Sequence, residues 1–129
     1  MVINITSGEC LNKILQERHS EDVFIPFNEA MINGTYSFKL FSEEFMSERS
    51  KIHGVTLEEY KNKLKDFLIF LKNINKYEKI VLWFGDEPFC RENTRIVLEA
   101  IHDYGYRHNI ILNIVNEENG NILVTQKIR

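Results

Sequence analysis

The sequence predicts a three-layer α/β fold, in which helices cover both faces of a mostly parallel sheet. Short runs of consecutive apolar residues alternate with longer segments whose apolar residues recur at helical spacing. These runs are nearly continuous in their hydrophobicity, which is typical of strands that are buried on both faces. An Asn-Gly pair at 119–120 favours a hairpin that returns the last run antiparallel to the one before it. Right-handed crossovers then favour the strand order 2-1-3-4-5, with the fifth strand antiparallel at an edge.

Composition and charge narrow the class of protein further. The chain has 129 residues, 43% of them hydrophobic, two cysteines and a formal net charge of −3. It is too apolar for a disordered chain and too poor in cysteine for a disulfide scaffold. No segment approaches the ~18 consecutive apolar residues of a membrane span, and the lysines form no basic stripe of the kind that binds nucleic acid. We therefore expect one cytoplasmic domain over residues 1–129, with neither a membrane nor a nucleic acid as partner.

The first half of the chain contains two expected strands and an ambiguous segment. Residues 2–6 form the first strand, and a helix follows the turn Thr6-Ser7-Gly8, with Ser7 as its expected cap. Residues 23–27 form the second strand. Residues 30–41 contain the turn signal Asn33-Gly34 and then a short stretch that we interpret as extended.

Two capping patterns locate the middle helices. Ser42 precedes a helix that we expect to end near Ile52, before His53-Gly54. Thr56 and Glu59 form a capping box, and helical spacing then continues to Ile74, which predicts one long helix.

The last part of the chain contains three expected strands and one expected helix. Residues 79–84 are the most apolar run and form the expected central strand, and Pro88 suits the first turn of the helix that follows. That helix ends at Gly105. Residues 110–115 and 122–128 form the last two expected strands, around the Asn-Gly turn.

A candidate site follows from the predicted strand order. The topology reverses between the first and third strands, and sheets of this type bind ligands at that reversal, outside the carboxyl ends of the strands. Polar residues follow these strand ends, and two of the ends lead directly into helices. The residues that we expect at a ligand-binding site there are Ser7, Gly8, Glu9, Glu29, Arg49, Asp86 and Glu87.

Two interpretations of the acidic residues remain open. Clustered carboxylates raise one another's pKa unless a cation joins them. This favours a divalent-metal site with Glu29 and Asp86 as ligands, and with metal-assisted hydrolysis or phosphoryl transfer as the fitting reaction. Alternatively, acids in the first turn of a helix stabilise that helix by ~0.3–1 kcal/mol each and need no other role.

Arg49 and the two cysteines also have two interpretations each. Arg49 shares a helix face with Phe45 and Ile52, so it needs a partner. It either reaches Glu29, Asp86 or an anionic ligand, with His53 nearby, or forms a structural ion pair. Cys10 and Cys90 both fall in a first helical turn, where a thiol is either activated by the helix or is a small buried residue.

The expected function is the binding of a small ligand or a divalent metal at the carboxyl end of the sheet, and the sequence specifies no cofactor. The alternative is a non-catalytic interaction or sensory module. In that case the aromatic residues Tyr36, Phe38 and Phe41 bind another protein or a second copy of the chain as a homodimer.

Four segments carry a resemblance to a known family. They are ITSGECLNKIL, FIPFNEAMINGTYS, FSEEFMSERSKIHG and VLWFGDEPFCRENTRIVLEAI, and they occur in family order over residues 2–115. On these segments the chain resembles the bacterial family called domain of unknown function 1835. The resemblance implies an α/β fold and gives weight to Gly8, Glu9, Gly34, Arg49 and the Asp86-Glu87 turn, but it implies no activity.

Overall fold

The computed structural model describes residues 1–129 and contains one five-stranded sheet. Its strand order is β2-β1-β3-β4-β5, as the sequence predicts. The first four strands, β1 (Val2–Thr6), β2 (Phe24–Pro26), β3 (Lys79–Phe84) and β4 (Asn109–Val115), are parallel. Strand β5 (Ile122–Lys127) pairs antiparallel with β4 at one edge.

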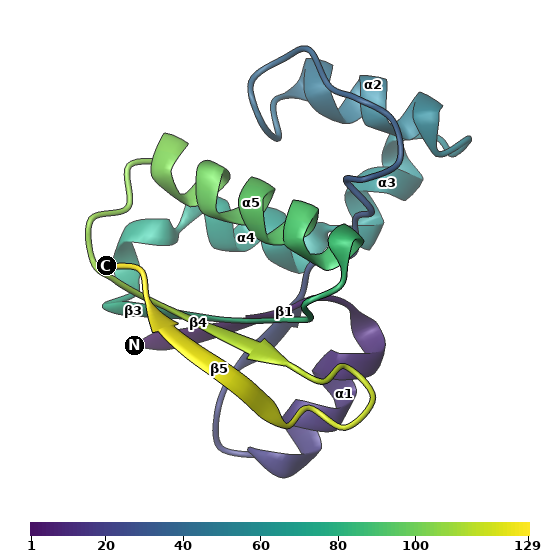
Figure 1. Ribbon diagram of the computed structural model, residues 1–129. Helices are drawn as coiled ribbons and strands as arrows, with labels where there is room; N and C mark the ends of the chain where they lie inside the picture. The colour runs from purple at the N-terminus through teal and green to yellow at the C-terminus, as the bar shows by residue number, and fades with distance from the viewer.

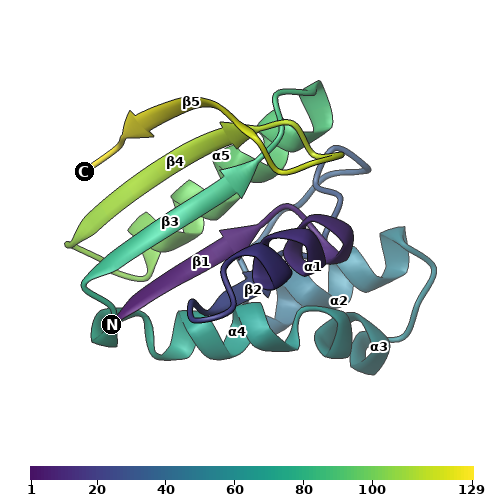
Figure 2. The ribbon, with the colours of Figure 1, turned by 90° about the horizontal axis from the view of Figure 1, so that it is seen from below.

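Helices cover both faces of this sheet, which confirms the three-layer prediction. Helix α1 (Glu9–Arg18) packs on one face, and helices α4 (Lys65–Lys72) and α5 (Pro88–Asp103) pack on the other (Figures 1 and 2). Helices α2 (Glu43–Ile52) and α3 (Leu57–Lys63) lie at the end of the molecule toward which the parallel strands point (Figure 2). None of these helices is both long and apolar enough to cross a membrane.

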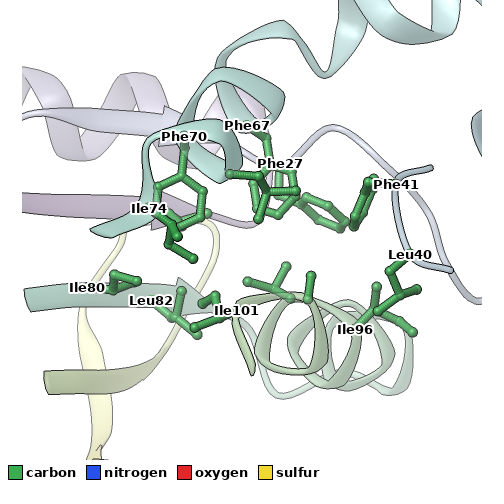
Figure 3. Close-up of a cluster of buried hydrophobic side chains, with 14 of the residues drawn as sticks. Phe27, Leu40, Phe41, Phe67, Phe70, Ile74, Ile80, Leu82, Ile96 and Ile101 are labelled. Carbon is green, nitrogen blue, oxygen red and sulfur yellow. The ribbon is translucent and has the colours of Figure 1, made fainter. Parts of the chain in front are cut away.

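The hydrophobic core is divided by the sheet into two unequal parts. The larger cluster has 25 buried residues and lies between the sheet and helices α4 and α5. Phe67 and Phe70 of α4 face Ile80 and Leu82 of β3 across it (Figure 3). The smaller cluster has six buried residues on the α1 side, with Trp83 among them. Burial on both faces explains why β3 is apolar along its whole length.

Three expectations about local structure are wrong. The predicted helix from 56 to 74 is divided at Leu64, whose φ of −99° and ψ of 9° lie outside the helical range, into α3, α4 and a short 3-10 turn at Ile74–Lys76. The helical spacing persists across this break because Tyr60, Leu64 and Phe67 all face the core. A bend of this kind therefore cannot be predicted from the spacing of the apolar residues.

The other two corrections concern loops. Residues 30–41 form no strand; Leu40 and Phe41 are buried in the core, and Phe41 has a positive φ of 60°. The link between β4 and β5 is longer than the two-residue turn that Asn-Gly predicts. In it the Asn116 N–H donates to the Asn121 carbonyl, and Gly120 has a φ of 74°.

Candidate functional site

The exits of β1 and β3 lie side by side at the carboxyl end of the sheet. Thr6 is opposite Trp83 in the parallel register, and the Ser7 N–H donates to the Trp83 carbonyl at 3.0 Å. Gly8 and Gly85 therefore belong to adjacent turns at the same edge of the sheet, as the predicted strand order requires. This is the topological reversal at which related sheet architectures hold their ligands.

The side chain of Glu117, which follows β4, lies across this reversal. One carboxylate oxygen accepts from the Ser7 hydroxyl, and the other accepts from the Cys90 thiol at 2.8 Å. Gly85 makes the approach possible, because a Cβ there would lie 2.7 Å from Glu117 Oε1. Ser7 is thus not the cap of α1: Gly8 holds the cap position without any side-chain hydrogen bond.

The cysteines differ from each other in their surroundings. Cys10 is exposed and Cys90 is buried, so the interpretation of both as small buried residues is correct only for Cys90. Burial, together with the hydrogen bond to Glu117, raises the pKa of Cys90 to about 12. Cys90 is therefore a thiol that donates a hydrogen bond, and it is no thiolate nucleophile at neutral pH.

Glu29 and Arg49 form a buried ion pair behind the surface of the site. Arg49 Nε and one terminal nitrogen donate to the two Glu29 carboxylate oxygens at 3.0 and 3.1 Å, and both side chains are 0% exposed. Arg49 also donates to the carbonyls of Thr35 and Ala30. Because these partners use the guanidinium donors, the structural interpretation of Arg49 is the one that the geometry supports.

Two further side chains complete the shell of Glu29. The Tyr60 hydroxyl donates to Glu29 Oε2 at 2.5 Å, and His53 Nε2 lies 2.5 Å from Glu29 Oε1. Asn93 of α5 holds the same loop, since its amide donates to the Glu29 carbonyl and its oxygen accepts from the Met31 N–H. Glu29 is thus fixed by side chains from helices α2, α3 and α5.

The balance of forces on Glu29 keeps it ionised. Burial by itself would raise the pKa of this carboxyl, but the hydrogen bonds from Arg49 and Tyr60 and the positive charge of Arg49 outweigh burial and lower it below its ordinary value. The same burial and the nearby carboxylate raise the pKa of Tyr60, so its hydroxyl stays protonated and remains a donor.

A hollow opens beside this ion pair at the ends of β1 and β2. It has a volume of about 320 Å³, and we call it the Ser7–His53 hollow. Its polar lining comes from Ser7, Asn28, His53 and Lys63, with Glu29 at its wall. The residues that line it are Ser7, Phe27, Asn28, Glu29, Ala30, His53, Val55, Tyr60 and Lys63.

The structure divides the predicted site residues between different places. Only Ser7 and Glu29 line the Ser7–His53 hollow. Asp86 and Glu87 line a separate hollow of about 390 Å³ with Glu117, and Asp86 is paired with Arg91 at 3.0 Å. Glu9 accepts from the Asn28 amide and lies over a third hollow, on the side of α1.

The predicted metal pair is therefore not brought together. Glu29 and Asp86 line different hollows, and both oxygens of Glu29 are occupied by protein donors. No three acidic, histidine or cysteine side chains are grouped to hold a metal ion. Of the partners expected for Arg49, the structure shows Glu29 and not Asp86, and Arg49 is completely buried.

Sequence reasoning missed two residues of this region. Tyr60 lies within the helical spacing from 56 to 74, and that spacing carries no sign of its hydroxyl contact with Glu29, 31 positions away. Glu117 follows a predicted strand, and this position indicates that it lies at the carboxyl end of the sheet. Its contacts with Ser7 and Cys90, however, depend on the pairing of three strands.

Comparison with known proteins finds no matching family model, no matching curated protein and no matching solved structure. Membership of the domain of unknown function 1835 family stays a prediction from the four segments that carry the resemblance.

Proposed function

We propose that the chain binds a small molecule with a carboxylate or phosphate group in the Ser7–His53 hollow. The hollow lies at the carboxyl end of the parallel sheet, beside the topological reversal, which is where sheets of this order hold their ligands. Its volume of about 320 Å³ is near the lower end of the range for small-molecule sites. The ligand is accordingly small.

The orientation of His53 is the observation that carries this proposal. His53 Nε2 lies 2.5 Å from Glu29 Oε1 and 3.2 Å from a terminal nitrogen of Arg49, so this ring nitrogen is turned toward the buried ion pair. These contacts fix the imidazole and leave Nδ1 as the ring nitrogen free for a ligand, to which it donates a hydrogen bond when the ring carries both protons. The side chain of His53 is 24% exposed, whereas that of Glu29 is completely buried, so the histidine is the accessible member of the pair.

The charged side chains of the lining favour an anion, and Glu9 and Glu117 contact Asn28 and Ser7 from outside it. The only carboxylate in the lining is Glu29, and Arg49 neutralises it from behind. Lys63 adds a positive charge at the exposed side of the hollow. Helix α1 begins next to Ser7 with no side chain capping its first amides, and these amides favour negative charge as well.

Titration of the full chain with inorganic phosphate, acetate and short dicarboxylates, followed by amide NMR shifts and thermal melts, tests the proposal. We expect shifts at Ser7, His53 and Lys63, and an increase in stability that follows ligand concentration. Lys63→Met should weaken binding. Lys65→Met, at another exposed lysine outside the hollow, is the matched control.

His53→Gln provides the second variant, since it removes the imidazole and leaves an amide of similar size. A loss of binding in Lys63→Met and His53→Gln, with Lys65→Met unchanged, supports the proposal. Binding that is the same in all three variants, or shifts confined to residues outside the hollow, would overturn it.

A further inference from the structure

His53 belongs to the one residue type in the Ser7–His53 hollow that changes its charge near neutral pH. The titratable side chains in the lining are Glu29, His53, Tyr60 and Lys63. The contacts of Glu29 and Tyr60 keep the first ionised and the second protonated, and a lysine is positively charged at neutral pH. Histidine gains or loses its charge between about pH 5 and about pH 8. The protonation of His53 therefore decides how much positive charge the hollow offers to an anion.

The contacts of His53 Nε2 indicate where the hydrogen of a neutral imidazole lies. The terminal nitrogen of Arg49 that is 3.2 Å from Nε2 already donates to Glu29 Oε1 and to the Ala30 carbonyl, each at 3.1 Å. These two acceptors use both of its hydrogens. A bare Nε2 would therefore direct its lone pair at Glu29 Oε1, 2.5 Å away, with no hydrogen between them. A hydrogen on Nε2 makes the same contact a hydrogen bond, so the favoured neutral ring has Nε2 protonated and Nδ1 bare.

A neutral ring of this kind does not suit an anion in the hollow. The hydrogen-bond contacts of the His53 side chain are all made by Nε2, so Nδ1 has no partner within the chain. In the neutral ring Nδ1 is an acceptor, and its lone pair would face the negative oxygen of a bound carboxylate or phosphate. A second proton makes Nδ1 a donor and gives the ring a positive charge, and hydrogen bonds between ionised groups are the stronger kind. The anion and the proton therefore favour each other's binding.

The charged neighbours of His53 act in opposite directions. The titratable and charged groups around it are Glu29 of the loop after β2, Arg49 of α2, and Tyr60 and Lys63 of α3. Glu29 favours a charged imidazole, whereas Arg49 and Lys63 disfavour it. Tyr60 stacks on the imidazole with 6.4 Å between the ring centres and is uncharged. No charged side chain of α1 lines the hollow. An anion in the hollow adds a second negative charge beside Glu29, so it favours the charged ring.

We propose that an anion binds in the Ser7–His53 hollow together with one proton, which His53 takes up at Nδ1. This inference rests on the proposed function, since it concerns the regulation of the same site by pH. The proton comes from the solvent, forms the Nδ1–H bond and returns to the solvent when the anion leaves. At any pH where the free ring is neutral, binding therefore adds one anion and one proton to the protein. The affinity for the anion falls as the pH rises, and His53 sets this dependence.

Titration of the full chain with acetate at a series of pH values tests the proposal, because a simple carboxylate stays ionised from about pH 6 to about pH 9. Amide NMR shifts give the dissociation constant at each pH. We expect this constant to rise with pH and to approach a slope of about tenfold per pH unit where the free ring is neutral. The nitrogen shifts of the imidazole, measured in the same samples, should show a bare Nδ1 in the free protein at the alkaline end. The ring should also lose its proton at a higher pH in the acetate complex than in the free protein.

Two variants separate His53 from the other histidines. His102 is exposed on α5 and lies outside the hollow, so His102→Gln should bind acetate as wild type does at every pH. His53→Gln should bind weakly throughout, and wild type should approach it at the alkaline end. Circular dichroism checks that both variants are folded.

The outcomes distinguish this inference from the proposed function on which it rests. Acetate that shifts hollow residues with the same dissociation constant at both ends of the pH range would overturn the proton uptake and leave the anion site standing. A pH dependence that persists in His53→Gln, or that His102→Gln removes, would overturn the assignment to His53. Acetate shifts that fall outside the hollow at every pH would overturn the proposed function as well.

Discussion

The guanidinium of Arg49 and the carboxylate of Glu29 meet through two hydrogen bonds of 3.0 and 3.1 Å in a place where neither side chain is exposed. Arg49 comes from α2, and Glu29 comes from the loop after β2. The ion pair therefore joins the helical region at residues 43–63 to the end of the sheet. It also explains how a charged residue can lie on the apolar face of α2 next to Phe45.

Removal of one member of this pair should be strongly destabilising. Arg49→Met leaves Glu29 buried without its main partner, and we expect a loss of about 3–5 kcal/mol in the free energy of unfolding. Urea unfolding measures the loss. Arg95→Met breaks exposed ion pairs on α5 and should cost less than about 1 kcal/mol. A loss for Arg49→Met as small as that of the control would show that the pair does not hold the helices.

Acid should remove the contribution of Glu29 to stability. Burial raises the pKa of this carboxyl, but the hydrogen bonds from Arg49 and Tyr60 outweigh it and hold the pKa below its ordinary value of 4.5. A pKa that is lower in the folded state gives a stabilisation that is complete above 4.5 and is lost as the pH falls through the folded value.

The measurement is urea unfolding of wild type and Glu29→Gln from neutral pH downward. The advantage of wild type should be constant above pH 4.5 and should shrink below it. An advantage that stays the same at low pH would mean that Glu29 is not ionised in the folded protein.

A side chain at position 85 should displace Glu117, although the backbone conformation of Gly85 is not restricted to glycine. A Cβ there would lie 2.7 Å from Glu117 Oε1, so Gly85→Ala displaces Glu117 from Ser7 and Cys90 and should cost about 1–3 kcal/mol. Gly8→Ala is the matched control, because a Cβ at Gly8 meets nothing within 4 Å.

The double variant Gly85→Ala with Glu117→Ala tests the cause of this effect. With the carboxylate gone, the added methyl group has room, so the two changes should be non-additive in urea unfolding. Additive losses would show that Gly85 is required for some other reason.

The two cysteines should differ in their reactivity toward alkylating agents. Cys10 is exposed, whereas burial and the contact with Glu117 raise the pKa of Cys90 to about 12. In the native protein at neutral pH, iodoacetamide should label Cys10 alone, and Cys90 should react only after unfolding. Peptide mass spectrometry measures both sites. Equal labelling of the two in the native state would contradict the described burial of Cys90.

Much of the fold could be predicted because its signals are local. The hydroxyl of Ser42 accepts from the Phe45 N–H, and Thr56 and Glu59 form the capping box that their spacing predicts. Continuous apolar runs identified β1, β3 and β4, and chain connectivity with right-handed crossovers gave their order. The expectations that are wrong, at Leu64 and at Phe41, concern backbone angles that the apolar pattern does not encode.

By itself the sequence determined the order of the strands, the three layers and the edge at which we expect a site. The apolar periodicity and the helix caps act over short stretches, and crossover handedness follows from the connectivity of the chain. Only the tertiary structure decided which side chains meet there. Glu29 reaches Arg49 and Tyr60 across 20 and 31 positions, and Ser7 reaches Glu117 across 110. Such contacts depend on the packing of several elements at once, so no spacing along the chain records them.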